Sequence, residues 1–401
     1  MKILFVLNIG FNKGGPSVHL LTDVIESALK RGHQCHVVLK KTTDSELSGL
    51  EKLNEKYGDL LAVSLVKDMS SKKRGFVKRY LADCKYALMT SKIYKKNEYD
   101  VAFLQSTNVA WLYTGFFKKM KCPVVYNVQD IFPQNLKFSS QLPASKITYP
   151  VFCKLQNVAY KRAKRIITIS HDMKQTLVEQ GINSEKIDVV FNWSYDDGDI
   201  KLENIPADRV FDLGMDKSKT NVVYAGNIGK MQNVEIVAEA ARLSKDDPSV
   251  HYYIIGDGAN KAKVLSITDG LENVTILPMQ PSRYAESIYA QADINVIPLA
   301  KGGIKTALPS KTATVLRANK PIVFCIDPKS KFEKLIDGNM HIRVVDNIDS
   351  QGLLDAIREM RSLNDKNEDD REIIKNIFSR NNANKYVEVM ERMTVDSVPQ
   401  F

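Results

Sequence analysis

Short apolar segments that alternate with helix-like segments constrain the fold of this chain most strongly. In the first half they occur at residues 3–7, 35–39, 101–104, 124–127, 165–169 and 187–191. In the second half they occur at residues 221–224, 251–255, 274–277, 294–297 and 322–324. Such runs are typical of buried parallel strands, and their alternation with helices predicts a doubly wound α/β sheet.

The alternation is interrupted once, by an irregular, acidic stretch at residues 192–218. Because 401 residues exceed the usual size of one hydrophobic core, this break predicts two Rossmann-like domains, residues 1–195 and 196–380. We expect a helix at about residues 380–401 to pack back on the first domain. Open α/β sheets bind ligands outside the carboxyl ends of their strands, so we expect the domains to face a central cleft.

The composition excludes several classes of protein. The sequence has no apolar run of membrane-spanning length and no signal-peptide pattern, which predicts a cytoplasmic protein. The five cysteines are scattered and form no CxxC pair, so we expect buried thiols and neither a disulfide framework nor a metal site.

Positive charge is concentrated in the first half of the chain. Residues 1–200 carry 30 Lys and Arg against 19 Asp and Glu, whereas the remainder carries 27 against 28. The first half is therefore expected to meet an anionic partner, which charge alone leaves open as a membrane leaflet, a diphosphate-bearing molecule or nucleic acid.

Glycine-rich turns follow several predicted strands. The first contains Gly14 and Gly15 before a helix start, where backbone N–H groups are available to an anion. It lacks the GxGxxG pattern, and Lys40 and Lys41 follow the second strand where an acidic ribose partner would stand, which disfavours a dinucleotide cofactor. The alternative is an ordinary strand-to-helix turn.

The second half repeats this arrangement and supplies a predicted phosphate-binding site. Its candidate residues follow four successive strands and are Gly226, Asn227, Lys230, Gly256, Gly258, Pro278, Met279, Leu308, Pro309, Ser310 and Lys311. Glycines and lysines before helices favour binding of a diphosphate, and the loops at 256–258 and 278–279 are expected to flank a base and ribose.

Asp130 is the candidate catalytic residue. It follows the strand at 124–127 and lies beside Gln129, so it is placed to position or deprotonate a sugar hydroxyl. The alternative is that Asp130 caps a helix or turn.

The order of these motifs resembles the GT-B glycosyltransferases of family 4, in particular the bacterial branch that builds O-antigens, capsules and related surface polysaccharides. The motifs that carry the resemblance are GGPS at 14–17, NVQDIFP at 127–133, TIS at 168–170, FNW at 191–193, AGNIGKMQ at 225–232, IGDG at 255–258 and LPSK at 308–311.

The resemblance implies a retaining glycosyltransferase that needs no metal or other cofactor. The first domain would bind the acceptor through Gly15, Gln129 and Asp130, and the second would bind a nucleotide-sugar, most commonly a UDP-sugar. Gly14 and Gly15 would also line the donor phosphates, and Lys230 and Lys311 would face the diphosphate.

One departure from the family pattern concerns the donor sugar. The family's paired glutamates would fall on Thr306 and Thr314, which favours a donor with a different polar pattern, such as a deoxy or N-acetylated sugar.

The basic stretches of the first half predict contact with an anionic membrane surface. These stretches are interleaved with Phe76, Tyr80, Phe116 and Phe117, and they are Lys72–Arg74, Lys78–Arg79, Lys92–Lys96, Lys118–Lys121 and Lys161–Arg165. Peripheral membrane binding would suit a polyprenyl-diphosphate-linked sugar acceptor, and an ordinary solvated surface is the alternative. Nucleic acid is not expected, because no recognition motif accompanies the charge.

Two other functions remain open from the sequence. A nucleotide-sugar epimerase of GT-B architecture would share the nucleotide pocket but needs acid and base carboxylates, for which Asp130 is the one candidate. A non-catalytic sugar-nucleotide-binding or scaffold protein is the second alternative, to which Thr306 and Thr314 point.

Overall fold

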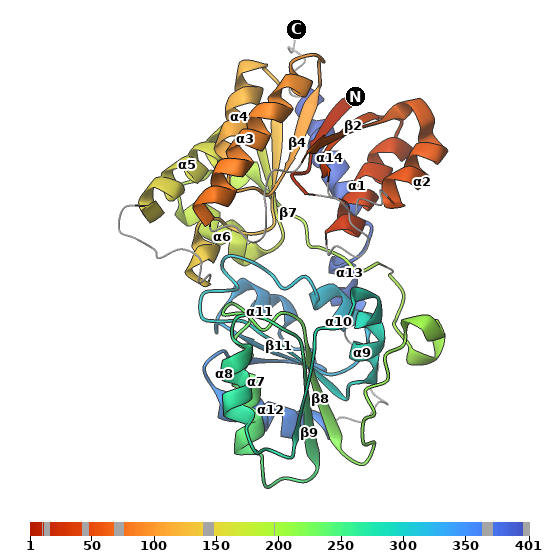
Figure 1. Cartoon of the computed structure of the whole chain (residues 1–401), viewed down its shortest axis with the longest axis vertical. Helices are drawn as coiled ribbons and strands as arrows, with labels where there is room; N and C mark the ends of the chain where they lie inside the picture. The colour runs from red at the N-terminus through yellow and green to blue at the C-terminus, as the bar shows by residue number, and fades with distance from the viewer. Residues whose placement is uncertain are drawn as a thin grey trace. The chain divides into compact units, whose positions relative to one another are not determined.

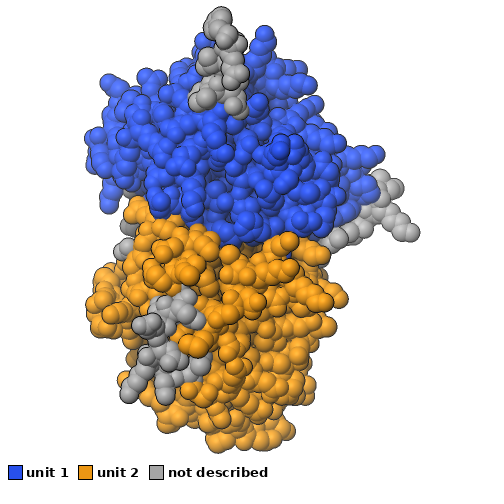
Figure 2. All heavy atoms as spheres, turned by 180° about the vertical axis from the view of Figure 1, so that it is seen from behind, with its two compact units in different colours: residues 1–191, 381–401 blue, residues 192–380 orange. Residues whose placement is uncertain are grey.

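The computed structural model describes residues 1–9, 11, 17–41, 48–67, 76–138, 148–195, 197–362 and 372–395 (Figure 1). The chain divides into two compact units, coloured separately in Figure 2. Unit 1 contains residues 1–191 together with 381–401, and unit 2 contains residues 192–380. Unit 1 is therefore built from two stretches of sequence that are separated by the whole of unit 2.

Unit 1 is built on a parallel sheet of seven strands in the order β3-β2-β1-β4-β5-β6-β7. The strands are β1 (Lys2–Val6), β2 (Gln34–Lys41), β3 (Leu61–Lys67), β4 (Val101–Gln105), β5 (Val124–Val128), β6 (Arg165–Thr168) and β7 (Ile187–Val189). The central strands β1 and β4 pair in register, with Ile3 opposite Val101. Both are buried on their two faces, which explains their uninterrupted apolar sequences.

Helices cover both faces of this sheet. They are α1 (Val18–Lys30), α2 (Ser48–Tyr57), α3 (Phe76–Tyr94), α4 (Ala110–Lys119), α5 (Thr148–Arg162), α6 (His171–Glu179) and α14 (Asn382–Val395). Helix α1 contacts α2 and α14, while α4 contacts α3 and α5. From β1 to β3 the chain moves along the sheet in one direction, and from β4 to β7 it moves in the other. Because crossovers between parallel strands are right-handed, this reversal is expected to place helices on both faces.

Unit 2 is built on a parallel sheet of six strands in the order β10-β9-β8-β11-β12-β13. The strands are β8 (Thr220–Ala225), β9 (Val250–Ile255), β10 (Val274–Leu277), β11 (Ile294–Pro298), β12 (Ile322–Ile326) and β13 (Ile342–Asp346). The helices are α7 (Glu235–Leu243), α8 (Lys261–Thr268), α9 (Ala285–Gln291), α10 (Thr312–Arg317), α11 (Lys331–Ile336), α12 (Ser350–Met360) and α13 (Glu372–Ile377). Helices α7 and α12 pack together on a core that includes Tyr224, Ile254 and Leu353.

The segment that follows unit 1 is held against unit 2 by buried cations. Arg317 and Lys375 are only 4% and 1% exposed. Lys375 Nζ lies 2.8 Å from Asp199 Oδ1, and Arg317 pairs with Asp197 and donates to the Lys375 carbonyl oxygen at 2.9 Å. These contacts join residues 197–199 to α10 and α13, so the segment is part of the packed structure of unit 2.

The doubly wound α/β fold is confirmed, and every segment predicted as a strand contains one. Strands β3 and β13 were missed, and both lie at an edge of their sheet. Edge strands are less buried, so polar side chains interrupt their apolar pattern; Leu65 of β3 is 38% exposed. Helix α13 buries Ile374, whereas its neighbour Ile373 is 76% exposed.

All five cysteines lie in the described segments, and none of them forms a disulfide bond. Cys35, Cys122 and Cys325 are buried as expected, whereas Cys84 and Cys153 are half-buried.

Candidate active site

The turn between β8 and α7 forms the centre of the candidate site in unit 2. Gly226 begins the turn with a φ of 148°, a value that a side chain would strain. The Tyr224 hydroxyl donates to the Asn227 carbonyl oxygen at 2.6 Å, and Asn227 Nδ2 donates to Gln232 Oε1 at 2.9 Å. Each bond ties the two ends of a short segment together, so the turn has a defined shape before any ligand binds.

A second glycine turn, which follows β9, packs directly on the first. The Ile228 amide donates to the Asp257 carbonyl oxygen at 2.8 Å. A Cβ atom added at Gly256 would lie 1.9 Å from the Gly226 carbonyl oxygen, and one at Gly258 would lie 2.5 Å from that of Ile228. Both positions therefore need glycine because one turn packs against the other, a role distinct from the predicted contact with a base or ribose.

Lys311 brings a cation to the first turn from the beginning of α10. Its Nζ donates to the Ala225 carbonyl oxygen at 2.9 Å and lies 3.8 Å from the centroid of the Tyr224 ring. Burial lowers the pKa of Lys311 to about 7, because the charged ammonium is removed from water. A bound anion would favour the protonated form, so this lysine is suited to bind a diphosphate.

The remaining predicted donor residues lie on the same loops with different exposure. Leu308 is 6% exposed and supports the loop from within, whereas Ser310 and Lys230 are exposed. The end of β10 is joined to the glycine turns because the Gly256 amide donates to the Leu277 carbonyl oxygen at 3.0 Å.

The other candidates on these loops are Pro278 and Met279, which are exposed, and Pro309, which is half-buried. Taken together, the loops that carry the predicted donor residues lie at the carboxyl edge of one sheet.

The two threonines that replace the expected glutamates bond within unit 2. Thr306 Oγ1 donates to the Gly303 carbonyl oxygen at 3.1 Å, and its side chain is buried. Thr314 Oγ1 lies 3.3 Å from Ser194 Oγ. Both hydroxyl groups therefore have hydrogen-bond partners within unit 2.

In unit 1, Asp130 follows β5 at the carboxyl edge of the sheet and is exposed. Its neighbour Gln129 points inward, since Gln129 Nε2 donates to Asn127 Oδ1 at 3.1 Å and to the Tyr386 hydroxyl at 3.4 Å. Asn127 Nδ2 in turn donates to Gln105 Oε1 at 2.8 Å. This network fixes the strand end that presents Asp130.

Sequence reasoning missed three residues of these sites. Tyr224 directly precedes the AGNIGKMQ motif at 225–232, so its position in the sequence could have indicated that it belongs to the site, where its ring lies beneath Lys311 Nζ. Gln105 ends the buried strand beside β5, which is a weaker signal. Tyr386 had none, because it comes from α14, 259 residues after Asn127. The predicted residues Gly14 and Gly15 lie outside the described part of the chain.

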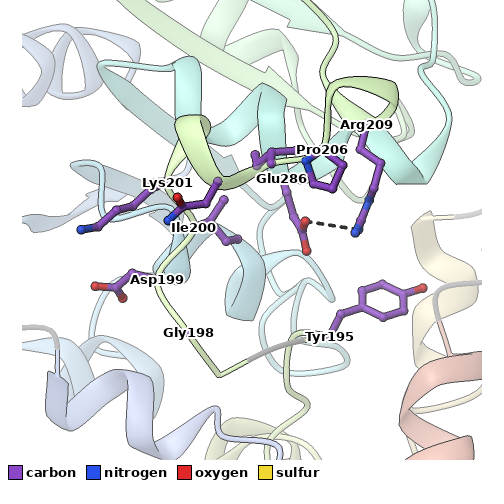
Figure 3. A pocket seen from close by; sticks show the side chains of 10 residues that line it. Tyr195, Gly198, Asp199, Ile200, Lys201, Pro206, Arg209 and Glu286 are labelled. Carbon is purple, nitrogen blue, oxygen red and sulfur yellow. Dashed lines mark hydrogen bonds and ion pairs between the residues drawn. The ribbon is translucent and has the colours of Figure 1, made fainter.

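A cavity of about 300 Å³ lies elsewhere in unit 2, beside the segment that follows unit 1 (Figure 3). Tyr195, Lys201 and Arg209 line it, and Arg209 forms an ion pair of 3.3 Å with Glu286 across it. The predicted donor residues are absent from its lining. This cavity is therefore distinct from the candidate site.

Helices that combine the length and the hydropathy needed to cross a membrane are absent from the described segments. Groups of three or more His, Cys, Asp and Glu side chains arranged to hold a metal ion are likewise absent from the part of the chain that the structure describes.

Comparison with known families gives matches over most of the chain. Residues 14–193 match the family described as Glycosyltransferase Family 4, and residues 219–362 match Glycosyl transferases group 1. The boundary between the two matches falls in the segment that follows unit 1.

Curated relatives match part of the chain. The probable glycosyltransferase WbjE of Pseudomonas aeruginosa is 24% identical over 216 residues, which are 52% of each protein. The putative colanic acid biosynthesis glycosyl transferase WcaI of Escherichia coli K12 is 27% identical over 179 residues, 43% of each. The chain thus aligns with about half the length of these relatives.

Solved structures match the whole fold. HepE of Anabaena, crystallised with UDP and glucose, matches with a TM-score of 0.62 at 17% sequence identity. The match covers 99% of this chain and 100% of the HepE chain. The UDP-GlcNAc 2-epimerase of Methanocaldococcus jannaschii has a TM-score of 0.60 at 12% identity, with coverage of 98% and 100%.

Proposed function

This chain belongs to the glycosyltransferases of GT-B fold, in which a Family 4 domain precedes a group 1 domain, and from that premise we propose that it transfers a sugar from a nucleotide-sugar to an acceptor. The observation that carries the proposal is the position of Lys311, held at the Ala225 carbonyl oxygen beside the glycine turn of β8. A diphosphate at this turn would meet one half-buried cation and a preformed backbone.

Unit 2 is the proposed donor-binding half. The donor we propose is a UDP-sugar, and the support is that HepE, whose fold this chain shares, was crystallised with UDP and glucose. Hydroxyl groups stand at Thr306 and Thr314 in place of carboxylates. This difference favours a donor hexose that is deoxygenated or N-acetylated.

Unit 1 is the proposed acceptor-binding half, with Asp130 at the acceptor hydroxyl. The proposed acceptor is a polyprenyl-diphosphate-linked saccharide used to build a surface polysaccharide. The name of WcaI, a putative colanic acid glycosyl transferase, supports this class of product. The excess positive charge of the first half would suit the acceptor's diphosphate.

The proposed reaction exchanges one glycosidic bond for another with retention of configuration and without a metal. The acceptor oxygen bonds to the anomeric carbon as the bond from that carbon to the diphosphate oxygen breaks. The acceptor's proton passes to an oxygen of the departing nucleoside diphosphate. Lys311 would stabilise the negative charge that develops on that leaving group, and Asp130 would orient the attacking hydroxyl.

The test is thermal unfolding in the presence of UDP-, GDP- and dTDP-sugars. A ligand that binds the folded protein raises its melting temperature, so one nucleotide class should give a clear shift. The shift should shrink in Lys311→Met and persist in Asp130→Asn, because only Lys311 lies at the proposed donor loops. The absence of a shift with every nucleotide would contradict the proposal.

An epimerase is the second candidate, which the fold shared with the UDP-GlcNAc 2-epimerase supports. An epimerase changes its nucleotide-sugar without an acceptor, whereas a transferase releases the nucleoside diphosphate when an acceptor is present. Incubation of each shifted nucleotide-sugar with and without a lipid-linked acceptor, followed by product analysis, separates the two. Binding without either product would favour the non-catalytic alternative.

A further inference from the structure

Exposed apolar side chains of unit 1 are concentrated on two helices. Among its described residues seven large hydrophobic side chains are exposed, and six of them lie on α3 and α5: Val77, Leu81, Leu88, Met89, Val151 and Val158. Val77 and Leu81 are 66% and 61% exposed. Burial in unit 1 therefore does not explain why these positions are apolar.

The same layer of helices is strongly basic. Helices α3, α4 and α5 together carry nine Lys and Arg residues and a single acidic residue, Asp83. Asp83 already pairs with Lys40 of β2, with 2.8 Å between Lys40 Nζ and Asp83 Oδ1. The positive charge of these helices is thus left without a matching number of acids on the helices themselves.

Apolar and basic residues alternate along one stripe of each helix. On α3 the exposed residues Lys78, Leu81, Lys85, Leu88 and Lys92 follow one another at spacings of three and four. Residues at such spacings lie on one face of a helix. Each leucine therefore has a lysine before and after it on the same face.

Helix α5 repeats the pattern. Val151, Lys154, Val158 and Lys161 are exposed and follow the same alternating spacing. The recurrence on a second helix means that the mixed face extends across more than one element.

Aromatic packing joins the helices into one layer. Phe152 of α5 lies 5.6 Å from Phe76 and 5.0 Å from Tyr80 of α3, measured between ring centroids. Phe76 and Phe117, which the sequence places among the basic stretches, are buried and do not reach the surface of the layer. The rings build the interior of the layer, which leaves the aliphatic side chains and lysines outside.

We propose that the exposed faces of α3 and α5 form a membrane-binding surface that recognises bilayers containing anionic lipids. Leucine and valine side chains would enter the boundary between headgroups and acyl chains, while lysines lay their aliphatic stems beside them and direct their ammonium groups to lipid phosphates. A second copy of the chain fits this surface poorly, since two faces rich in lysine repel each other. Nucleic acid would use the lysines but not the aliphatic residues.

The biological role of this surface, to bring the enzyme to a lipid-linked acceptor, rests on the proposed function. The experiment needs neither donor nor acceptor. The full-length protein is sedimented with vesicles of phosphatidylcholine alone and of phosphatidylcholine with phosphatidylglycerol, at low and high salt. A failure of membrane binding would therefore leave the glycosyl-transfer proposal standing, and the reverse also holds.

Two double variants separate charge from apolar contact. Lys85→Glu with Lys92→Glu should lower partitioning onto anionic vesicles by about tenfold or more, because each lysine near such a surface contributes appreciably. Leu81→Ser with Leu88→Ser keeps the net charge and should also lower it about tenfold or more. The matched controls are Lys52→Glu with Lys245→Glu and Leu243→Ser with Leu265→Ser, which alter exposed residues elsewhere and should change partitioning less than about twofold.

The proposal is overturned if the wild-type protein does not sediment with anionic vesicles, or sediments equally with neutral ones. It is also overturned if the leucine variant binds like wild type or if the controls lose as much as the test variants. Binding to duplex DNA in place of vesicles would assign the surface to nucleic acid instead. If either double variant melts early, the single substitutions Lys92→Glu and Leu88→Ser replace it.

Discussion

Lys311 makes the donor half sensitive to protonation. Because burial lowers its pKa to about 7, we expect the unliganded protein at pH 8 to hold this lysine mostly neutral. A bound diphosphate would raise the pKa again, so nucleotide binding at pH 8 should take up a proton. Calorimetric binding enthalpies measured at pH 8 should therefore vary with the ionisation enthalpy of the buffer.

Proton uptake on nucleotide binding is expected only in the pH range where Lys311 is neutral before the nucleotide binds. One pH unit below its pKa Lys311 should be mostly protonated, so proton uptake should fade as the pH drops towards 6, and affinity should decline as the pH rises above 7. The variant Lys311→Met should lose both the proton uptake and the pH dependence. Binding enthalpies that are the same in every buffer at pH 8 would contradict this account of Lys311.

Asp130 makes a different prediction because it lies in the other unit. Asp130→Asn should lower kcat about 10²-fold, the order expected when a reacting group loses its alignment. The donor-induced shift in melting temperature should be unchanged. Asp59→Asn, an exposed residue after α2, is the control. An equal loss of turnover in both variants would argue against a role for Asp130.

Lys375 carries a prediction about stability. Lys375→Met removes the cation from a nearly buried pair and leaves Asp199 without it, but Asp199 is 36% exposed, which moderates the cost. The free energy of unfolding should fall by about 1 to 3 kcal/mol in chemical denaturation. Lys263→Met, whose side chain is 67% exposed, should cost less than about 0.5 kcal/mol. Equal effects would show that burial of Lys375 contributes nothing.

At the scale of elements, the carboxyl-edge loops of unit 2 depend on close packing between glycine turns. Gly256→Ala would force a Cβ against the Gly226 carbonyl oxygen, so it should cost about 1 to 3 kcal/mol of stability and weaken nucleotide binding. Gly115→Ala in α4 is a suitable control, since its Cβ would meet only the end of the Arg162 side chain, 3.2 Å away. Nucleotide affinity that survives Gly256→Ala intact would separate this packing from the donor site.

Elements also show where prediction from sequence succeeds. Interior strands such as β1 and β4 were predictable because burial on both faces leaves an uninterrupted apolar run. The edge strands β3 and β13 were missed because one side of each lacks a partner strand and their sequences mix polar with apolar residues. The turn at Gly226 could be predicted because its glycine follows a predicted strand directly in the sequence. Tyr386 could not be predicted, because it contacts Gln129 only through the tertiary fold. Which faces of α3 and α5 stay exposed likewise depends on packing, as Phe76 illustrates.

At the scale of the whole molecule, α14 ties the end of the described chain to unit 1. Arg31 NH1 lies 2.7 Å from Glu391 Oε2, and Arg392 NH2 lies 3.1 Å from Asp188 Oδ1. Removal of residues 381–401 should therefore raise hydrogen exchange in β1 and β4 of unit 1 and leave β8 and β9 of unit 2 protected. The nucleotide-induced thermal shift should persist. Equal deprotection of both units would show that they unfold as one body.

Because α14 belongs to unit 1, unit 1 cannot be completed until the C-terminal residues have been synthesised. A ribosome makes residues 382–395 only after the entire sheet of unit 2 has left the peptidyl-transferase centre. Unit 1 is thus the unit whose synthesis begins first and ends last. Its hydrogen-bond network around Asn127 lacks the Tyr386 hydroxyl until α14 has been made. The surface proposed to meet the membrane consequently belongs to a domain that can mature only once its companion has been translated.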